Sequence, residues 1–216
     1  MTEQQSVLVN AVTGTTLSSQ TMLKAIEMLS EVKEVDKLKT IIYFQSKYGS
    51  SKQYALWLAE DLQCEARETE SVSLDDLRSY DVILCVGGLY ASGVSGFGKI
   101  KKHLGQLKSK SLLLCMVGMT NPVEKERYEE IFRHNVPEEY RSFVKPFALR
   151  GDRLFSKMSG LHKMMMKIPK KAVEKIPVEE RTEENRLFLE SFGKDTHFVS
   201  RENIREIVEY VRGLSE

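Results

Sequence analysis

Apolar and polar positions change their spacing in a regular order along the chain. Four short runs are almost continuously apolar, a pattern typical of strands that are buried on both faces of a sheet. They lie at residues 40–44, 81–88, 111–119 and 143–151. Between and after these runs, apolar residues recur at helical spacing. These stretches predict helices at residues 52–62, 96–107, 122–136 and 200–213.

Two weaker signals complete the pattern. Residues 64–68 predict a short strand, and residues 73–80 predict a helical turn with Ser73 as its N-cap. Strands that alternate with helices indicate a doubly wound α/β domain with a parallel sheet. In such domains, ligands bind at the carboxyl ends of strands. We therefore expect a site in the loops after Phe44, Val86 and Val117.

The loop after the first strand is rich in hydroxyl groups and precedes a predicted helix. Free N–H groups at a helix N-terminus, together with serine hydroxyls, suit a phosphate monoester. The loop lacks the G-x-x-x-x-G-K-[ST] of a P-loop and the G-x-G-x-x-G of a dinucleotide site. A serine-capped helix without a ligand is the alternative. The candidate residues are Ser46, Lys47, Tyr48, Gly49, Ser50 and Ser51.

The loops after the next two strands add glycines and an aromatic ring. Glycine lets the backbone approach a flat ligand closely, and a tyrosine ring can stack on such a ligand. Together with the first loop, these features predict a site for a phosphorylated planar heterocycle. The candidate residues are Gly87, Gly88, Leu89, Tyr90, Ala91, Ser92, Gly93, Gly118, Met119 and Thr120.

Composition and charge narrow the class of protein. A formal net charge of +1 argues against a globally basic nucleic-acid binder. Cys64, Cys85 and Cys115 lack a CxxC spacing and are expected to be reduced thiols. The histidines lack a metal-binding spacing, so we expect no metal site, and His162 alone is a candidate for a role. No apolar run is long enough to cross a membrane, and we expect a cytoplasmic protein.

Residues 151–171 are basic and rich in methionine. Their apolar positions recur at spacings of three and four, which predicts one apolar helical face. An ordinary helix packed on the domain is one interpretation; a lid over the site, or a contact with anionic lipid headgroups through residues 153–171, is the other. If the acidic segment at 172–196 folds back, it would neutralise these basic residues and weaken a membrane contact. The predicted apolar positions are Leu154, Met158, Leu161, Met165 and Ile168.

Residues 1–38 precede the first predicted strand and form an extension to a domain at 39–216. They predict a polar arm followed by a helix at 20–38. A packing helix, a partner-binding arm and a disordered tail all remain open for this extension.

The three loops resemble those of the flavodoxin family. The first loop of flavodoxins reads roughly [ST]-x-[ST]-G-x-[ST] and binds the phosphate of FMN, and Ser46, Gly49 and Ser51 match it. Tyr48 stands where many flavodoxins have threonine, so Tyr48→Thr is expected to tighten FMN binding. The resemblance implies a five-stranded parallel sheet in the order 2-1-3-4-5, with residues 152–196 inserted before the last helix.

The segments at 147–167 and 196–208 are similar to the C-terminal half of the bacterial quinone-dependent protoporphyrinogen IX oxidases. This resemblance implies an FMN-dependent oxidoreductase that dehydrogenates a tetrapyrrole precursor and passes electrons to a quinone. It also implies that the flavin carries the chemistry, with a quinone or a redox protein as partner. A lipid contact through the basic residues 153–171 would place the protein peripherally at the inner face of the cell membrane. A flavodoxin-like electron carrier or interaction module without its own substrate is the alternative.

Overall fold

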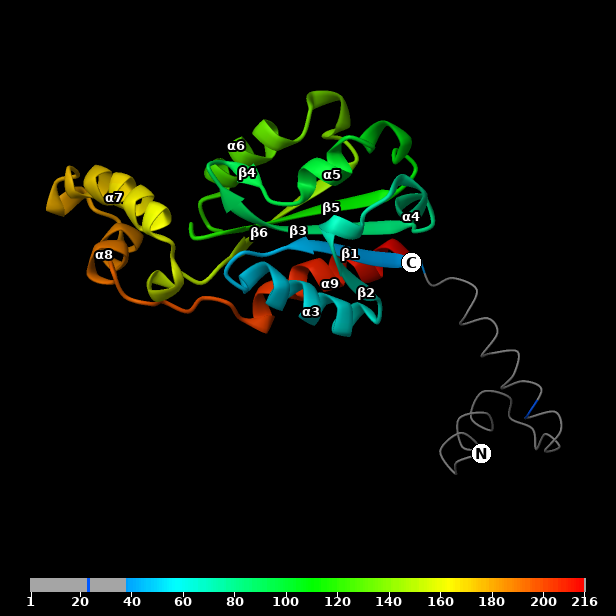
Figure 1. Cartoon of the computed structure of the whole chain (residues 1–216), viewed down its shortest axis with the longest axis horizontal. Helices are drawn as coiled ribbons and strands as arrows, with labels where there is room; N and C mark the ends of the chain where they lie inside the picture. Colours follow the sequence, from blue (N-terminus) through cyan, green and yellow to red (C-terminus); the bar gives the residue numbers. More distant parts are fainter. Residues whose placement is uncertain (1–22, 24–37, 216) are drawn as a thin grey trace, which may run out of the picture. The chain divides into compact units, whose positions relative to one another are not determined.

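A sheet of parallel strands lies at the centre of the domain in this computed structural model, which describes Leu23 and residues 38–215 (Figure 1). The strands are β1 (Thr40–Gln45), β2 (Glu65–Glu68), β3 (Val82–Tyr90), β4 (Gly93–Val94), β5 (Ser111–Gly118) and β6 (Val144–Arg150). Parallel pairing gives the order β2-β1-β3-β5-β6, and the two-residue β4 pairs antiparallel with the end of β3. Since β4 lies outside the parallel path, β5 and β6 are its fourth and fifth strands. The structure therefore confirms the predicted α/β class and the predicted order 2-1-3-4-5. The predicted arm and helix of residues 1–38 lie almost entirely outside the described residues.

Helices cover both faces of this sheet (Figure 1). On one face, α3 (Ser50–Leu62) packs with α9 (Arg205–Arg212), and on the other lie α5 (Phe97–Lys101) and α6 (Lys125–Asn135). The short α4 (Leu74–Arg78) lies between β2 and β3 in the chain. Five 3-10 helices within this part of the chain are η1 (Thr69–Ser71), η2 (Leu104–Gln106), η3 (Glu138–Tyr140), η6 (Arg201–Ile204) and η7 (Gly213–Ser215).

Alternate strand residues supply the two halves of the core, as the twofold period of a strand requires. Ile41 and Tyr43 of β1 belong to the buried cluster that contains Phe97 of α5 and Phe132 of α6. In the helix predicted at 200–213, the apolar residues that recur at helical spacing are all buried, which confirms that they face the core. They are Ile204, Ile207, Val208 and Val211.

The predicted helix boundaries are right in part. The Ser73 hydroxyl accepts the Asp76 N–H at 3.1 Å, which confirms the predicted N-cap, and α9 ends directly before Gly213 as expected. The helix predicted at 96–107 exists but is too long, because α5 stops at Lys101 and His103 leaves the helical region with φ −110° and ψ 1°. Glycines within that stretch weaken a continuous helix.

The loop expected after Val86 also begins later than predicted. The strand β3 continues to Tyr90, so Gly87 and Gly88 lie inside it, and the chain then turns back into β4. A Cβ atom on Gly87 would lie 2.3 Å from the carbonyl oxygen of Ser95. Glycine at this position therefore allows the returning strand to lie against β3.

The segment after β6 forms a separate group of helices beyond the carboxyl ends of the strands (Figure 1). It contains η4 (Phe155–Lys157), α7 (Gly160–Glu174), η5 (Val178–Glu180) and α8 (Glu183–Glu190). Backbone hydrogen bonds between Arg153 and Thr196 close its base. Arg150 of β6 pairs with Glu184 of α8, which attaches the segment to the sheet.

The predicted apolar face of this segment is right only in part, because Leu161, Met165 and Ile168 lie on a helix but are exposed, and the other two positions precede it. Ser159 caps α7 by accepting the His162 N–H at 3.3 Å, so the helix begins after Leu154 and Met158 and its buried face passes through Met166. The acidic segment neutralises the basic residues less than expected, because in the described chain Lys170, paired with Glu174, is the only α7 lysine in an ion pair. The apolar residues that α7 exposes are Leu161, Met164, Met165 and Ile168.

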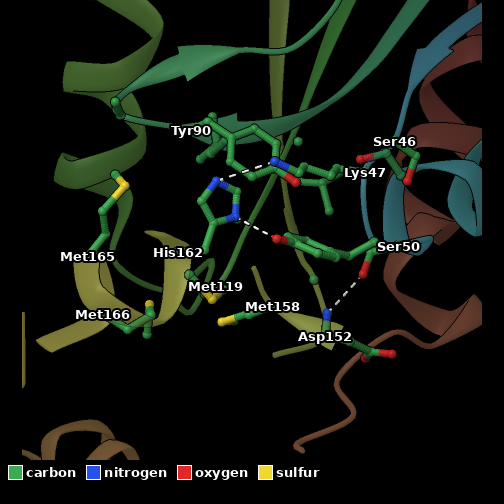
Figure 2. A pocket seen from close by; sticks show the side chains of 18 residues that line it. Ser46, Lys47, Ser50, Tyr90, Met119, Asp152, Met158, His162, Met165 and Met166 are labelled. Atoms are coloured by element: carbon green, nitrogen blue, oxygen red, sulfur yellow. Dashed lines mark hydrogen bonds between the residues drawn. The ribbon is translucent and has the colours of Figure 1, made fainter. Parts of the chain in front are cut away.

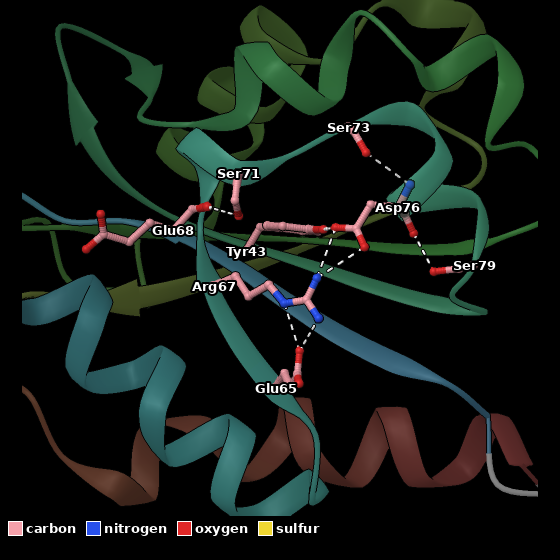
Figure 3. Close-up of polar contacts among 8 residues, drawn as sticks. All are labelled: Tyr43, Glu65, Arg67, Glu68, Ser71, Ser73, Asp76 and Ser79. Atoms are coloured by element: carbon pink, nitrogen blue, oxygen red, sulfur yellow. Dashed lines mark hydrogen bonds and ion pairs between the residues drawn. The ribbon is translucent and has the colours of Figure 1, made fainter.

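A polar cluster fixes the edge strand β2 (Figure 3). Arg67 of β2 reaches Asp76 of α4 at 3.1 Å and also pairs with Glu65, and Asp76 accepts the hydroxyl of Tyr43 from β1. Burial and this carboxylate raise the pKa of Tyr43, so the phenol remains a donor. The cluster therefore connects the edge strand to its neighbour and to the following helix.

Candidate functional site

A cavity of about 200 Å³ lies at the carboxyl ends of β1, β3, β5 and β6, beneath α7 (Figure 2). Its position is the one that the order of strands predicts for a ligand site. The lining is mostly apolar, with hydroxyl groups gathered on the side of the first loop. The lining residues are Ser46, Lys47, Tyr48, Ser50, Ser51, Gly88, Leu89, Tyr90, Ala91, Val117, Gly118, Met119, Gly151, Asp152, Met158, His162, Met165 and Met166.

Most of the site residues predicted from the sequence meet in this cavity, and five do not line it. Gly87 faces the returning β4, and Gly49 forms the turn before α3 with a left-handed φ of 101°. The carbonyl oxygen of Thr120 accepts the Tyr128 hydroxyl at 2.8 Å, which directs this residue toward α6. Ser92 and Gly93 belong to the hairpin that leads into β4.

The sequence suggested that the inserted segment could form a lid over the site, but it did not identify which residues of that segment, or which at the ends of β5 and β6, line the cavity. Gly151 and Asp152 follow a strand, so the same rule that selected the first three loops would have found them. The α7 residues carried no such signal, because their position depends on how the insertion folds over the sheet. The missed residues are Val117, Gly151, Asp152, Met158, Met165 and Met166.

The first loop holds its hydroxyl groups ready for an acceptor. The Ser46 hydroxyl accepts the Gly49 N–H at 3.1 Å, and the Ser50 hydroxyl accepts the Asp152 N–H at 3.0 Å. Each oxygen uses a lone pair in this way and keeps its hydrogen available to donate. Ser50 also begins α3, where the first N–H groups have no partner inside the helix and the dipole favours negative charge. The loop can therefore bind an anion.

The second loop presents Tyr90 at the end of β3. The turn beyond it passes through Ala91 and Ser92, which have left-handed φ values of 48° and 65°. Asn135 of α6 holds this turn: its amide donates to the Ser92 carbonyl at 2.7 Å, and its oxygen accepts the Val94 N–H at 3.0 Å. Burial raises the pKa of Tyr90 to about 12, so its ring stays neutral and offers an apolar face.

The third loop adds an adaptable apolar group. Gly118 ends β5, where a Cβ atom would lie 2.8 Å from Leu89 and 3.0 Å from the Tyr128 hydroxyl. This close approach leaves Met119 at the cavity with 41% of its surface exposed. Thioether side chains fit ligands of irregular shape, so the third loop supplies a flexible apolar wall.

His162 connects the inserted helix to the first two loops (Figure 2). Its Nε2 lies 3.5 Å from Lys47 Nζ, and an ammonium can only donate, so in the neutral ring the hydrogen is assigned to Nδ1. That Nδ1–H donates to the Tyr48 hydroxyl oxygen at 2.6 Å, which also accepts the Ser159 N–H at 3.4 Å. The ring stacks on Tyr90, with centroids 5.5 Å apart and planes at 27°.

Asp152 lines the cavity but points its carboxylate at the backbone. One oxygen accepts the N–H groups of Phe198 and Val199 at 2.7 and 2.9 Å, and the other lies 3.2 Å from His197 Nδ1. The Asp152 carboxylate is therefore used to hold the segment that leads into α9. Its role is to position the floor of the cavity.

Among the residues that the structure describes, no group of His, Cys, Asp and Glu side chains is arranged to hold a metal ion. Also within residues 38–215, none of the helices has the length and apolar character required to cross a bilayer. Cys85 and Cys115 are buried free thiols, as expected, and burial raises the pKa of Cys85 to about 12.

Comparisons with known proteins give one family match. A family model described as a flavodoxin domain matches residues 41–177, whereas no curated protein matches the chain. Among solved structures, two-electron reduced flavodoxin from Megasphaera elsdenii is 17% identical, with a TM-score of 0.40 over 51% of this chain and 85% of that one. A flavoprotein in complex with FMN from Lactobacillus acidophilus is 17% identical, with a TM-score of 0.33, and the match covers 52% of this chain and 92% of that one. A flavodoxin from the domain Archaea is 11% identical, with a TM-score of 0.36, and the match covers 81% of this chain and 99% of that one.

Proposed function

The chain belongs to the flavodoxin domain family, and from this premise we propose that it binds FMN in the cavity beneath α7 and acts as a redox protein. The observation that carries the proposal is the arrangement of the first loop. Ser46 and Ser50 have hydroxyl hydrogens available beside the N-terminus of α3, which suits the phosphate of FMN. Tyr90 and the apolar wall suit the planar ring system.

The test of cofactor binding is a titration of the purified protein with FMN. We expect saturable quenching of flavin fluorescence, because an excited flavin ring stacked on the Tyr90 ring accepts an electron from the phenol and returns to the ground state without emission. Riboflavin, which lacks the phosphate, should bind at least about tenfold more weakly, since charge-assisted hydrogen bonds to the first loop are lost. A protein that is colourless and does not quench added FMN would rule out the proposal.

The finer proposal concerns the reaction. We infer that the protein dehydrogenates a reduced tetrapyrrole, in the manner of quinone-dependent protoporphyrinogen IX oxidases, and passes the electrons to a quinone. When bound, FMN supplies the redox chemistry, and the chain supplies binding, orientation and exclusion of water. Three methionines from different segments, Met119, Met158 and Met166, give the cavity a wall that can adapt to a bulky apolar partner.

Anaerobic turnover distinguishes this enzyme from an electron carrier. Protein loaded with FMN is mixed with protoporphyrinogen and a menaquinone analogue, and we expect porphyrin fluorescence to rise as the quinone is reduced. Protein that binds FMN but leaves both compounds unchanged, while exchanging electrons with another redox protein, would support the carrier interpretation instead.

The outer face of α7 supports a contact with an anionic lipid surface. Leu161, Met164 and Ile168 are 61%, 59% and 71% exposed, an unusual set of large apolar groups on one helical face. Lys167 and Lys171 are exposed on the same helix and belong to no ion pair among residues 38–215. Apolar groups that enter a bilayer beside lysines that meet headgroups define an interfacial helix. We propose that α7 lies at the surface of an anionic membrane in this way.

Vesicle sedimentation tests this contact. The double variant Leu161→Ser and Ile168→Ser should bind vesicles containing phosphatidylglycerol at least about tenfold more weakly than the wild type, because two apolar side chains no longer enter the bilayer. The matched control is Val178→Ser, which removes a similar exposed group, 64% exposed, outside α7. Equal binding by the double variant and the wild type would contradict the proposal, as would a wild type that stays in solution.

A further inference from the structure

His162 and Tyr90 both line the cavity, and the His162 ring covers one face of the Tyr90 ring. The two rings are stacked with their centroids 5.5 Å apart. A flat ring placed between them needs roughly 7 Å between the outer planes, because each layer of contact takes about 3.5 Å. The present spacing leaves no room for such a ring. A ligand can stack on this face of Tyr90 when His162 moves away.

The size of the cavity also indicates that the site must open before a cofactor can bind. It measures about 200 Å³, whereas sites for ligands of cofactor size usually begin at roughly 300 Å³. The wall that limits it on one side is α7, through His162, Met165 and Met166. Moving the first turns of α7 outward would enlarge the cavity from this side, without a change in the sheet.

Few polar contacts hold the beginning of α7 over the cavity. They are those of His162 with Lys47 and Tyr48, and the Ser159 N–H to the Tyr48 hydroxyl. Farther along the helix, Pro169 has no N–H to donate to the Met165 carbonyl. This interruption of the helical hydrogen bonds lets the first turns, which carry His162, change direction relative to the rest of α7.

From these observations we propose that His162 is a gate residue: its ring competes with the isoalloxazine of FMN for the face of Tyr90, and cofactor binding requires the Lys47–His162–Tyr48 contacts to open. The inference rests on the proposed binding of FMN and adds how the site admits it. Molecules in the closed arrangement cannot bind FMN. The apparent dissociation constant is therefore the intrinsic constant divided by the fraction of molecules in the open arrangement.

Stopped-flow mixing with FMN tests the gate. The flavin-free protein is prepared as wild type and as His162→Ala, and the association rate is read from fluorescence quenching. We expect the variant to associate about tenfold faster, because it loses a hydrogen bond and a stacked contact that hold the closed arrangement. Tyr48→Phe should associate faster by a smaller factor, since it weakens only the hydrogen bonds. Ala172→Ser, at an exposed position of the same helix beyond Pro169, is the matched control and should leave the rate unchanged.

A second measurement follows α7 itself. Hydrogen exchange at residues 159–163 should become faster when FMN binds to the wild type, while exchange at residues 46–51 becomes slower. Equal association rates for His162→Ala and wild type, or stronger protection of residues 159–163 with FMN bound, would overturn the gate. A wild type that neither quenches FMN nor changes its exchange would instead overturn the proposed function, so the two failures are distinct.

Discussion

Replacing Ser50 with aspartate should lower the affinity for FMN at least about a hundredfold and leave the affinity for riboflavin almost unchanged. The Ser50 hydroxyl faces the cavity at the first turn of α3. A carboxylate there would stand beside the phosphate, and two unit charges 4 Å apart repel each other by about 4 kcal/mol at an effective dielectric constant of 20. The same carboxylate suits the positive end of the helix, so the fold should be retained.

Titrations with both flavins measure this effect. Ser50→Asn is the matched control, because it keeps a polar side chain of similar size without the charge, and it should cost less than about tenfold in FMN affinity. The interpretation depends on the difference between the ligands. A parallel loss of riboflavin binding would mean that the loop itself is disturbed, and unchanged FMN binding would mean that the phosphate lies elsewhere.

Replacing Gly87 with alanine should destabilise the fold by about 3 kcal/mol, the upper part of the range for overpacking a closed site. The new Cβ atom would meet the Ser95 carbonyl oxygen at 2.3 Å and a methyl group of Val94 at 2.6 Å. The first of these neighbours is backbone, so a change of rotamer cannot relieve the contact. The returning hairpin would have to move, and Tyr90 at its start would move with it.

Urea unfolding without added FMN measures this loss as a lower midpoint. Gly98→Ala is the matched control: a Cβ atom on Gly98 would meet nothing within 4 Å, and the residue lies in α5. Alanine in a helix should stabilise by roughly 0.5–1 kcal/mol. Equal unfolding free energies for the two variants would show that the hairpin can shift away from β3 at little cost.

The strands were predictable because continuous apolar runs leave few alternatives in a parallel sheet. The runs that became β3 and β5 are buried almost throughout, and their order along the chain fixed the site at their carboxyl ends. The hairpin at residues 89–94 was missed because glycine is common both in loops and in strands where another backbone approaches closely. The sequence alone does not separate these two cases.

The position of α7 over the cavity was only partly predictable from the sequence, for a different reason. Spacings of three and four fit several neighbouring faces of one helix, and the choice among them depends on where the helix begins. Ser159 sets that beginning, which buries Met166 and turns Met165 partly outward. The contact of His162 with Tyr48 joins residues far apart in the chain, so no local pattern announces it. His162 was selected from the sequence by its place in the insertion alone.

The two outer strands of the sheet differ from its central strands in composition. On one side, β2 has four residues, three of which are charged, and on the other side β6 contains Lys145 and Pro146. Short length, charge and proline at a free edge all oppose the addition of a further strand from another molecule. The almost continuously apolar strands β3 and β5 are therefore bordered, within residues 38–215, by strands that oppose intermolecular β-sheet formation at high protein concentration.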